Sequence, residues 1–276
     1  MDPSDQISPL NNVKEINHQI FFLGTMHIAE TSAQKVAAVI QQIQPQVVMV
    51  ELDMMRFQEL QKRASQGVIP TPSKSDSSPA NVKHSEFFNS TDNQIDSFRP
   101  YTETGLSTQK KAQKNDFFTL LGTLQQELGQ VFKITPGAEM LSAVTTAQQM
   151  RIPIAFIDRP IIETFARMQE LGEQVKAEQE HMTKQMEEEP FTMEDLQKMI
   201  EELKDPANIR EMIQEFEKNY PQLFQVLIQE RNEYMTEQIL TYNNNHPNHS
   251  ILVITGAGHT DDLLTTVQRE LQKRSK

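Results

Sequence analysis

The chain of 276 residues contains no cysteine, which excludes disulfide bonds and thiolate ligands to a metal ion. Any metal site must therefore use histidine and carboxylate side chains. A chain without cysteine is compatible with the cytoplasm, and we expect a cytoplasmic location. The hydrophobic content of 37% is low for a wholly compact chain, so we expect part of the chain to be solvated rather than packed into a core.

Long apolar runs are also absent. No stretch approaches the roughly 20 apolar residues of a membrane-spanning helix, so no such segment is expected. The first residues are polar and acidic, unlike a signal peptide. Basic residues are few, with 26 Lys and Arg against 38 Asp and Glu and a net charge of −12, most of it in residues 169–237. Such an acidic surface repels a phosphate backbone, so we expect no nucleic-acid partner.

Short apolar runs alternate with helical patterns along the chain. Buried strands are expected at residues 16–23, 47–50, 152–157 and 251–255. A helical pattern separates the first two runs, which predicts a strand–helix–strand unit with parallel strands and adjacent C-terminal ends. The sequence therefore predicts an α/β fold in which helices flank a central, mainly parallel sheet.

We expect a single domain over residues 1–276, with two segments that depart from the sheet. Residues 64–115 are rich in Ser, Pro, Asn, Gln and Lys and cannot bury a core, so we interpret them as a disordered insertion. Residues 160–242 follow a helical pattern almost throughout, with breaks at prolines. This pattern predicts a helical subdomain within the domain.

Two of the expected strands lead into the same short pattern, Gly-x-x-His. Gly24 and His27 form it near the start of the chain, and Gly256, Gly258 and His259 lie in the second copy. A glycine after a buried strand lets the backbone turn where a side chain would collide. The histidines then follow strand C-terminal ends, where open α/β sheets bind ligands. We therefore expect both histidines in one site.

Charged residues follow the other two strands. Glu51 and Asp53 come after the second strand, and Asp158 and Arg159 come after the third. Because parallel strands bring their C-terminal ends to one edge of the sheet, these side chains are expected near the two histidines.

Two histidines and one glutamate form a ligand set used for a hydrolytic divalent metal with an open position for water. His27, Glu51 and His259 are the predicted ligands. Imidazole and carboxylate ligands without thiolate suit Zn, Mn, Co or Fe(II). Glu139 or Asp158 is a candidate general base or hydrogen-bond partner of a ligand.

Arg159 and Arg231 are candidates to neutralise an oxyanion or to clamp a carboxylate. Simpler interpretations stay open. Asp53 can cap the next helix, and Asp158 can pair with Arg159 or a helix N-terminus. Glu230 and Arg231 are, by pattern alone, an exposed pair on a charged helix.

Six segments, in order, resemble the motifs of the TraB/PrgY/GumN family, which includes the Tiki proteins. They are Gly24-Thr25-Met26-His27-Ile28-Ala29, Val47-Val48-Met49-Val50-Glu51-Leu52-Asp53 with Arg56, Pro136-Gly137-Ala138-Glu139-Met140, Ile157-Asp158-Arg159-Pro160-Ile161, Glu230-Arg231-Asn232 with Tyr234-Met235, and Gly256-Ala257-Gly258-His259. Each motif alone is weak, but six in order are specific. The resemblance covers the ordered parts of the chain and not residues 64–115.

The resemblance implies a fold akin to erythromycin esterase and ChaN-like proteins. For Tiki-like members it implies metal-dependent peptide cleavage by the two Gly-x-x-His histidines and a glutamate. For PrgY-like members it implies restriction of a peptide pheromone, or pheromone shutdown. Many relatives have C-terminal membrane helices, which this chain lacks. The resemblance favours functional roles for Glu139, Arg56, Asp158 and Arg231. We expect Glu139, Arg231 and Arg159 to be catalytic, and we expect contact with a metal ligand or the substrate from Arg56, Asp158, Asp53 and Glu230.

We therefore expect a metal-dependent hydrolase, most simply a peptidase, with a Mn, Co or Zn ion on the predicted ligands and Glu139 as general base. Two alternatives stay open. One is a protein that binds and sequesters a peptide or small ligand without turnover, and the other is a metal-free esterase using His and Glu. The expected partner is a peptide or small-molecule substrate, and self-association into a homo-oligomer is left open.

Overall fold

The computed structural model describes residues 10, 13–25, 30–66, 137–188, 192–203 and 205–274. The predicted ligand His27 lies outside these residues. So does the predicted insertion, apart from its first three positions at residues 64–66.

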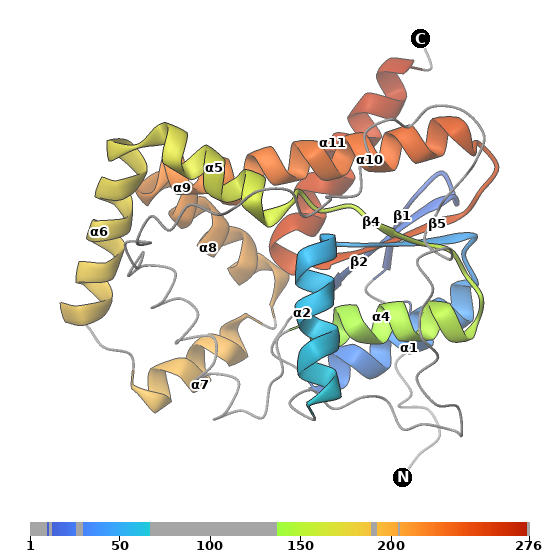
Figure 1. The fold of residues 1–276 in the computed structure, drawn as a ribbon, viewed down its shortest axis with the longest axis horizontal. Helices are drawn as coiled ribbons and strands as arrows, with labels where there is room; N and C mark the ends of the chain where they lie inside the picture. Colours follow the sequence, from blue (N-terminus) through green and yellow to red (C-terminus); the bar gives the residue numbers. More distant parts are fainter. Residues whose placement is uncertain are drawn as a thin grey trace, which may run out of the picture.

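The core of the fold is a five-stranded sheet with strand order β1-β2-β5-β3-β4 (Figure 1). The strands are β1 (Val13–Ile16), β2 (Ile20–Thr25), β3 (Val47–Val50), β4 (Ile154–Phe156) and β5 (Ile251–Gly256). All neighbouring strands are parallel except β1 and β2, which are antiparallel. The expected α/β fold with a central, mainly parallel sheet is confirmed.

Helices cover both faces of the sheet, which explains why a central strand such as β3 is apolar throughout, while the edge strand β1 carries exposed Lys14 and Glu15. One face packs against α1 (Glu30–Ile43), α2 (Met54–Ser65) and α4 (Ala138–Gln149), and the other against α10 (Glu230–Asn245) and α11 (Ala257–Arg274) (Figure 1). In β5, Leu252 and Ile254 face the first group while Ile251 and Val253 face the second. Full burial of each such side chain contributes about 1.5–3 kcal/mol.

The expected strand at residues 16–23 is wrong, because the chain reverses within it. Val13–Ile16 and Ile20–Thr25 form an antiparallel hairpin in which Ile16 pairs with Ile20. Asn17 and His18 have φ values of 53° and 54° in the turn between them. Asparagine and histidine adopt this left-handed region more readily than most residues, so the turn needs no glycine or proline to mark it.

The helical pattern expected over residues 160–242 corresponds to several helices that precede α10. They comprise α5 (Ile161–Leu171), α6 (Glu173–Glu188), α7 (Met193–Glu202), α8 (Pro206–Asn219), α9 (Pro221–Phe224) and the π-helical turn η4 (Gln225–Gln229). Figure 1 shows α5, α6, α8 and α9 to one side of the sheet. A separate small core, which includes Met168, Val175, Tyr220 and Leu223, holds several of them together. Their status as a subdomain stays a prediction.

The helices within the described ranges include none that combines the length and the apolar character needed to cross a membrane.

Gly24 has a different role from the expected one. It does not turn the chain, because β2 continues through Thr25. Instead, a Cβ atom at position 24 would lie 2.7 Å from Oγ1 of Thr260 in α11. That hydroxyl is already bonded to the carbonyl of Gly256 and lies 3.0 Å from Oγ1 of Thr255, so it has little freedom to move.

We therefore expect Gly24→Ala to lower the free energy of unfolding by about 1–3 kcal/mol, as over-packing does in other cores. Gly258→Ala is the matched control, because its Cβ would meet only Cδ1 of Ile213, at 3.3 Å, and alanine favours the helix. Urea denaturation of both variants measures the difference. Equal destabilisation would contradict the close packing of β2 against α11.

Candidate functional site

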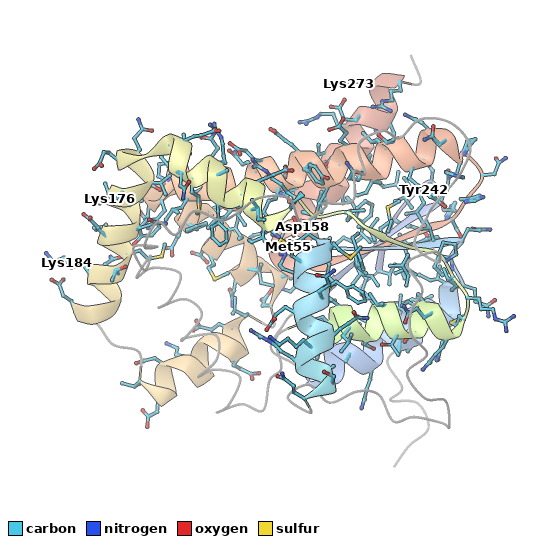
Figure 2. The ribbon with its side chains drawn as sticks, in the orientation of Figure 1. Met55, Asp158, Lys176, Lys184, Tyr242 and Lys273 are labelled. Atoms are coloured by element: carbon cyan, nitrogen blue, oxygen red, sulfur yellow. The ribbon has the colours of Figure 1, made fainter. Side chains whose placement is uncertain are left out.

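Four side chains meet at the C-terminal edge of the sheet and form what we call the strand-end cluster. Glu51 follows β3, Asp158 follows β4, His259 lies in the first turn of α11 after β5, and Arg231 reaches them from α10. Figure 2 labels Asp158, beside the start of α2. Of the four strand ends expected to meet, three lie together here and Arg231 joins them, while the fourth, with His27, lies outside the described residues.

Arg231 is the centre of this cluster. Its Nη2 donates to Oε1 of Glu51 at 2.5 Å and to Oδ2 of Asp158 at 2.6 Å, while Nε donates to Oδ1 of Asp158 at 3.0 Å. Its Nη1 donates to the carbonyl of Leu227 at 2.9 Å and lies 3.2 Å from Nε2 of His259. These contacts engage all five N–H groups of the guanidinium. An oxyanion-binding role for Arg231 would require one of these bonds to be given up.

Glu51 is buried and held at both carboxylate oxygens. Oε2 accepts a 2.7 Å hydrogen bond from the backbone N–H of Gly256, and Oε1 accepts from Arg231. Burial alone would raise the pKa of Glu51, but the positive charge of Arg231 and the hydrogen bond from the Gly256 N–H lower it. Glu51 is therefore an ionised carboxylate at neutral pH.

Asp158 is also buried and ionised. Besides Arg231 it binds the guanidinium of Arg56, and Oδ1 accepts from the backbone N–H of Arg159 at 2.7 Å. Burial would raise the pKa of Asp158, and the hydrogen bonds and charges of Arg231 and Arg56 lower it. Arg159 therefore binds Asp158 through its backbone N–H, and the positive charges that pair with the Asp158 carboxylate belong to Arg56 and Arg231.

His259 is buried and fixed by its Nδ1 atom, which lies 2.6 Å from Oδ1 of Asn232. Its Nε2 atom lies 3.4 Å from Oε1 of Glu51. The backbone explains this placement, because the second Gly-x-x-His segment ends β5 and begins α11 without an intervening loop.

The described residues fit a divalent metal in one respect. Two ligand atoms about 2.1 Å from a tetrahedral ion lie about 3.4 Å apart, which matches the separation of Glu51 Oε1 and His259 Nε2. Because Arg231 is bonded to both atoms, an ion there would compete with its hydrogen bonds. No group of three or more His, Asp or Glu side chains within the described ranges is arranged to hold a metal, and His27 lies outside them.

Asp53 has the simpler role that the sequence left open. Its Oδ1 accepts from the backbone N–H groups of Met55 and Arg56 at 2.8 and 3.1 Å, so it caps α2. Its Oδ2 accepts from Nε of Arg56 at 2.5 Å. Asp53 therefore orients Arg56 toward Asp158 and acts on the cluster indirectly.

Arg159 points away from Glu51 and toward the helical region. Its Nη1 donates to Glu230 at 2.6 Å, and Glu230 also accepts from Arg167 at 2.9 Å. Burial would raise the pKa of Glu230, and these two arginines lower it. The interpretation of Glu230 and Arg231 as an exposed pair is wrong, since their side chains are only 17% and 14% exposed. Glu139 is buried in the first turn of α4, and its role as general base stays a prediction.

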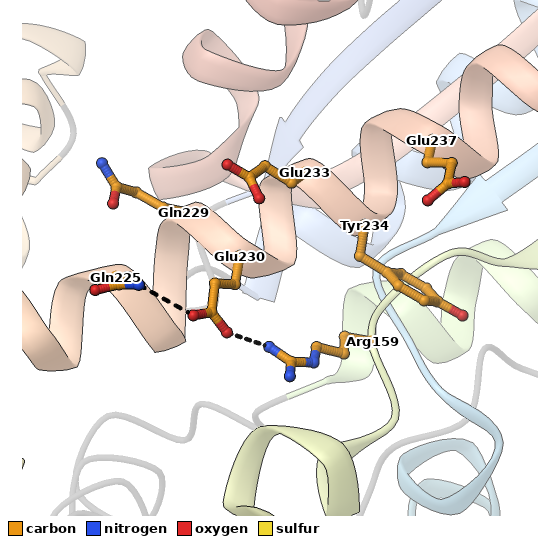
Figure 3. A pocket seen from close by; sticks show the side chains of 7 residues that line it. All are labelled: Arg159, Gln225, Gln229, Glu230, Glu233, Tyr234 and Glu237. Carbon is orange, nitrogen blue, oxygen red and sulfur yellow. Dashed lines mark hydrogen bonds and ion pairs between the residues drawn. The ribbon is translucent and has the colours of Figure 1, made fainter. Parts of the chain in front are cut away.

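A groove of about 480 Å³ lies next to the cluster, between α10 and the segment after β4 (Figure 3). It is lined by Arg159, Gln225, Gln229, Glu230, Glu233, Tyr234 and Glu237. Burial and the charges of Glu163 and Asp158 raise the pKa of Tyr234, so its phenol stays neutral. The groove therefore offers carboxylates, carboxamides and a phenol to a ligand.

Sequence reasoning missed Asn232 and the π-helical turn. Asn232 stood in the motif Glu230-Arg231-Asn232 but received no role, because a helical pattern does not show which neighbour an asparagine meets. The turn at Gln225–Gln229 has no sequence signature that we can identify, although such turns often occur at functional sites. Its Leu227 carbonyl helps to hold Arg231.

A sequence model of the TraB/PrgY/gumN family matches residues 10–268. The chain is also 25% identical over 264 residues to the uncharacterized protein MJ1365 of Methanocaldococcus jannaschii. That alignment covers 94% of this chain and 55% of the relative, so the chain spans about half the relative's length.

Proposed function

Because the chain belongs to the TraB/PrgY/gumN family, we propose that it is a metal-dependent hydrolase acting on a peptide, with its reaction centre at the strand-end cluster and His27. The observation that carries the proposal is the 3.4 Å separation of Glu51 Oε1 and His259 Nε2. Thr25 pairs with Gly256 at the ends of β2 and β5, so the two Gly-x-x-His segments leave the sheet from adjacent strands. This adjacency supports His27 as the third ligand.

When bound, a divalent ion supplies an activated water and a positive charge toward a developing oxyanion. Glu51 and His259 would hold such an ion, of which Mn, Co and Zn suit the ligand set. Arg231 keeps two buried carboxylates ionised and in place, Asp158 in turn holds Arg231, and Arg56 holds Asp158. Removal of a proton from the attacking water is proposed for Glu139.

The groove beside the cluster is the proposed substrate surface. Gln225 and Gln229 can donate to and accept from a peptide backbone, and Glu233 and Glu237 suit a positively charged side chain or amino terminus. The negative charge of the chain would attract such a peptide electrostatically. Cytoplasmic location and homo-oligomerisation stay predictions.

Digestion of a peptide library tests the proposal. The full chain is incubated with Mn, Co or Zn and, separately, with EDTA, and products are identified by mass spectrometry. We expect cleavage that EDTA abolishes and that falls by more than about 100-fold in His259→Gln, since even an outer partner of a metal ligand is worth about 10–100-fold. His18→Gln is the control, because His18 is 89% exposed and should leave cleavage unchanged.

One observation favours a second candidate, hydrolysis of an ester without a metal. Arg231 already places a positive charge against Glu51 and His259. Ester hydrolysis that survives EDTA but is lost in His259→Gln would support this candidate and contradict the first. Peptides that are retained intact by the protein through incubation would contradict both and favour a binding protein.

A further inference from the structure

Three successive residues of α10 serve three different partners. Successive helical residues point about 100° apart. Glu230 accordingly meets Arg159 and Arg167, and Arg231 meets the strand-end cluster. Asn232, which is 2% exposed, points instead toward α11.

Asn232 joins two residues of α11. Its Nδ2 donates to Oδ2 of Asp262 at 2.7 Å, and its Oδ1 lies 2.6 Å from Nδ1 of His259. A carboxylate accepts hydrogen bonds and does not donate them, so Asp262 requires the NH₂ side of the amide to face it. The oxygen of Asn232 must then face His259.

We infer that Asn232, oriented by Asp262, is a positioning residue that keeps the proton of His259 on Nδ1. An oxygen acceptor 2.6 Å from Nδ1 requires a hydrogen on that nitrogen. The surroundings of Nε2 agree, because the N–H donor Nη1 of Arg231 lies nearer to it, at 3.2 Å, than the acceptor Oε1 of Glu51, at 3.4 Å, and a lone pair on Nε2 suits the nearer group.

The use of Nε2 to bind a metal or to accept a proton rests on the proposed function. The position of the proton on the ring is a property of the chain alone. A histidine binds a metal, or accepts a proton, only through an unprotonated nitrogen. Asn232 fixes which nitrogen that is and holds the ring so that Nε2 faces Glu51. Without Asn232, the proton can move to Nε2, where it would oppose the Arg231 donor.

Nitrogen-15 NMR of the histidine rings tests this inference in the full chain, with EDTA present and no substrate. The His259 signals are identified by their loss in His259→Gln. We expect Nδ1 of the wild type to be pyrrole-like and Nε2 pyridine-like. In Asn232→Ala the two shifts should move toward each other, because Nδ1 loses its acceptor while Nε2 still faces Arg231.

Asp262→Asn is the second variant, because Asp262 is exposed and its replacement leaves the core intact. Its amide can donate as well as accept, so Asn232 can rotate, and the two His259 shifts should converge. Asp261→Asn is the control, since Asp261 pairs with Lys14 and Arg210 instead.

A wild-type ring with its proton on Nε2, a doubly protonated ring, or unchanged shifts in both test variants would overturn the inference. Failure of the proposed function looks different. In that case the Nδ1 tautomer and its loss in the variants would be observed, but no peptide would be cleaved.

Discussion

Replacing Arg231 by methionine is expected to lower the free energy of unfolding by about 3–5 kcal/mol, the usual cost of removing one partner of a buried ion pair. Methionine keeps much of the side-chain volume but leaves Glu51 and Asp158 buried, ionised and without their shared cation. Urea denaturation at neutral pH measures the change. It should appear as a lower midpoint at an unchanged denaturant slope.

Two controls separate the loss of charge pairing from a general effect of the substitution. Arg269→Met removes an arginine whose side chain is 60% exposed and pairs with Glu270, so it should change stability by no more than about 0.5 kcal/mol. Adding Glu51→Gln to Arg231→Met removes the carboxylate that is left without a guanidinium, whereas Asp158 keeps Arg56, so the double variant should regain part of the loss. Equal losses in Arg231→Met and Arg269→Met would contradict the central position of Arg231.

Acid is the second strong perturbation of the cluster. The pKa values of Glu51 and Asp158 are lower in the folded protein than their ordinary values of 4.5 and 3.8. The unfolded chain therefore binds these protons more readily, so stability is full above about pH 4.5 and is lost as the pH falls through the folded pKa values. Each unit by which a pKa is lowered contributes about 1.4 kcal/mol.

The measurement is urea denaturation at about pH 7, 5 and 3.5, because the loss of stability begins where the unfolded chain starts to bind these two protons, near its ordinary pKa values of 4.5 and 3.8. The double variant Glu51→Gln/Asp158→Asn has no carboxyl group to protonate at these positions. It should lose less stability than the wild type between neutral and acid pH. Parallel pH profiles for the two proteins would show that acid acts elsewhere in the molecule.

The strand ends were predictable from the sequence because strands buried on both faces are apolar throughout and stop where a charge appears. Glu51 after β3 and Asp158 after β4 are examples. The hairpin at Asn17 and His18 was not, since neither glycine nor proline marks the reversal. The sequence indicated Gly24 as a residue that turns the chain, whereas in the structure it makes room for Thr260. That contact could not be predicted, because Thr260 lies far along the chain.

The residues that complete the site come from α10, and the sequence indicates them poorly. Helical periodicity places Arg231 and Asn232 on a helix but does not say which strand end each faces. Their contacts depend on how α10 crosses the sheet and on the π-helical turn before it. The role of Asp53, in contrast, could be predicted from the sequence, because a helix cap involves residues that are neighbours in the chain.

The metal content of the protein tests the central claim most directly. The wild type and the double variant His27→Ala/His259→Ala are purified without chelator, supplied with Mn, Co or Zn, desalted and analysed by mass spectrometry. The proposal predicts a single tightly held divalent ion in each wild-type chain and its loss from the variant. Equal metal content in the two proteins, including none in either, would contradict it.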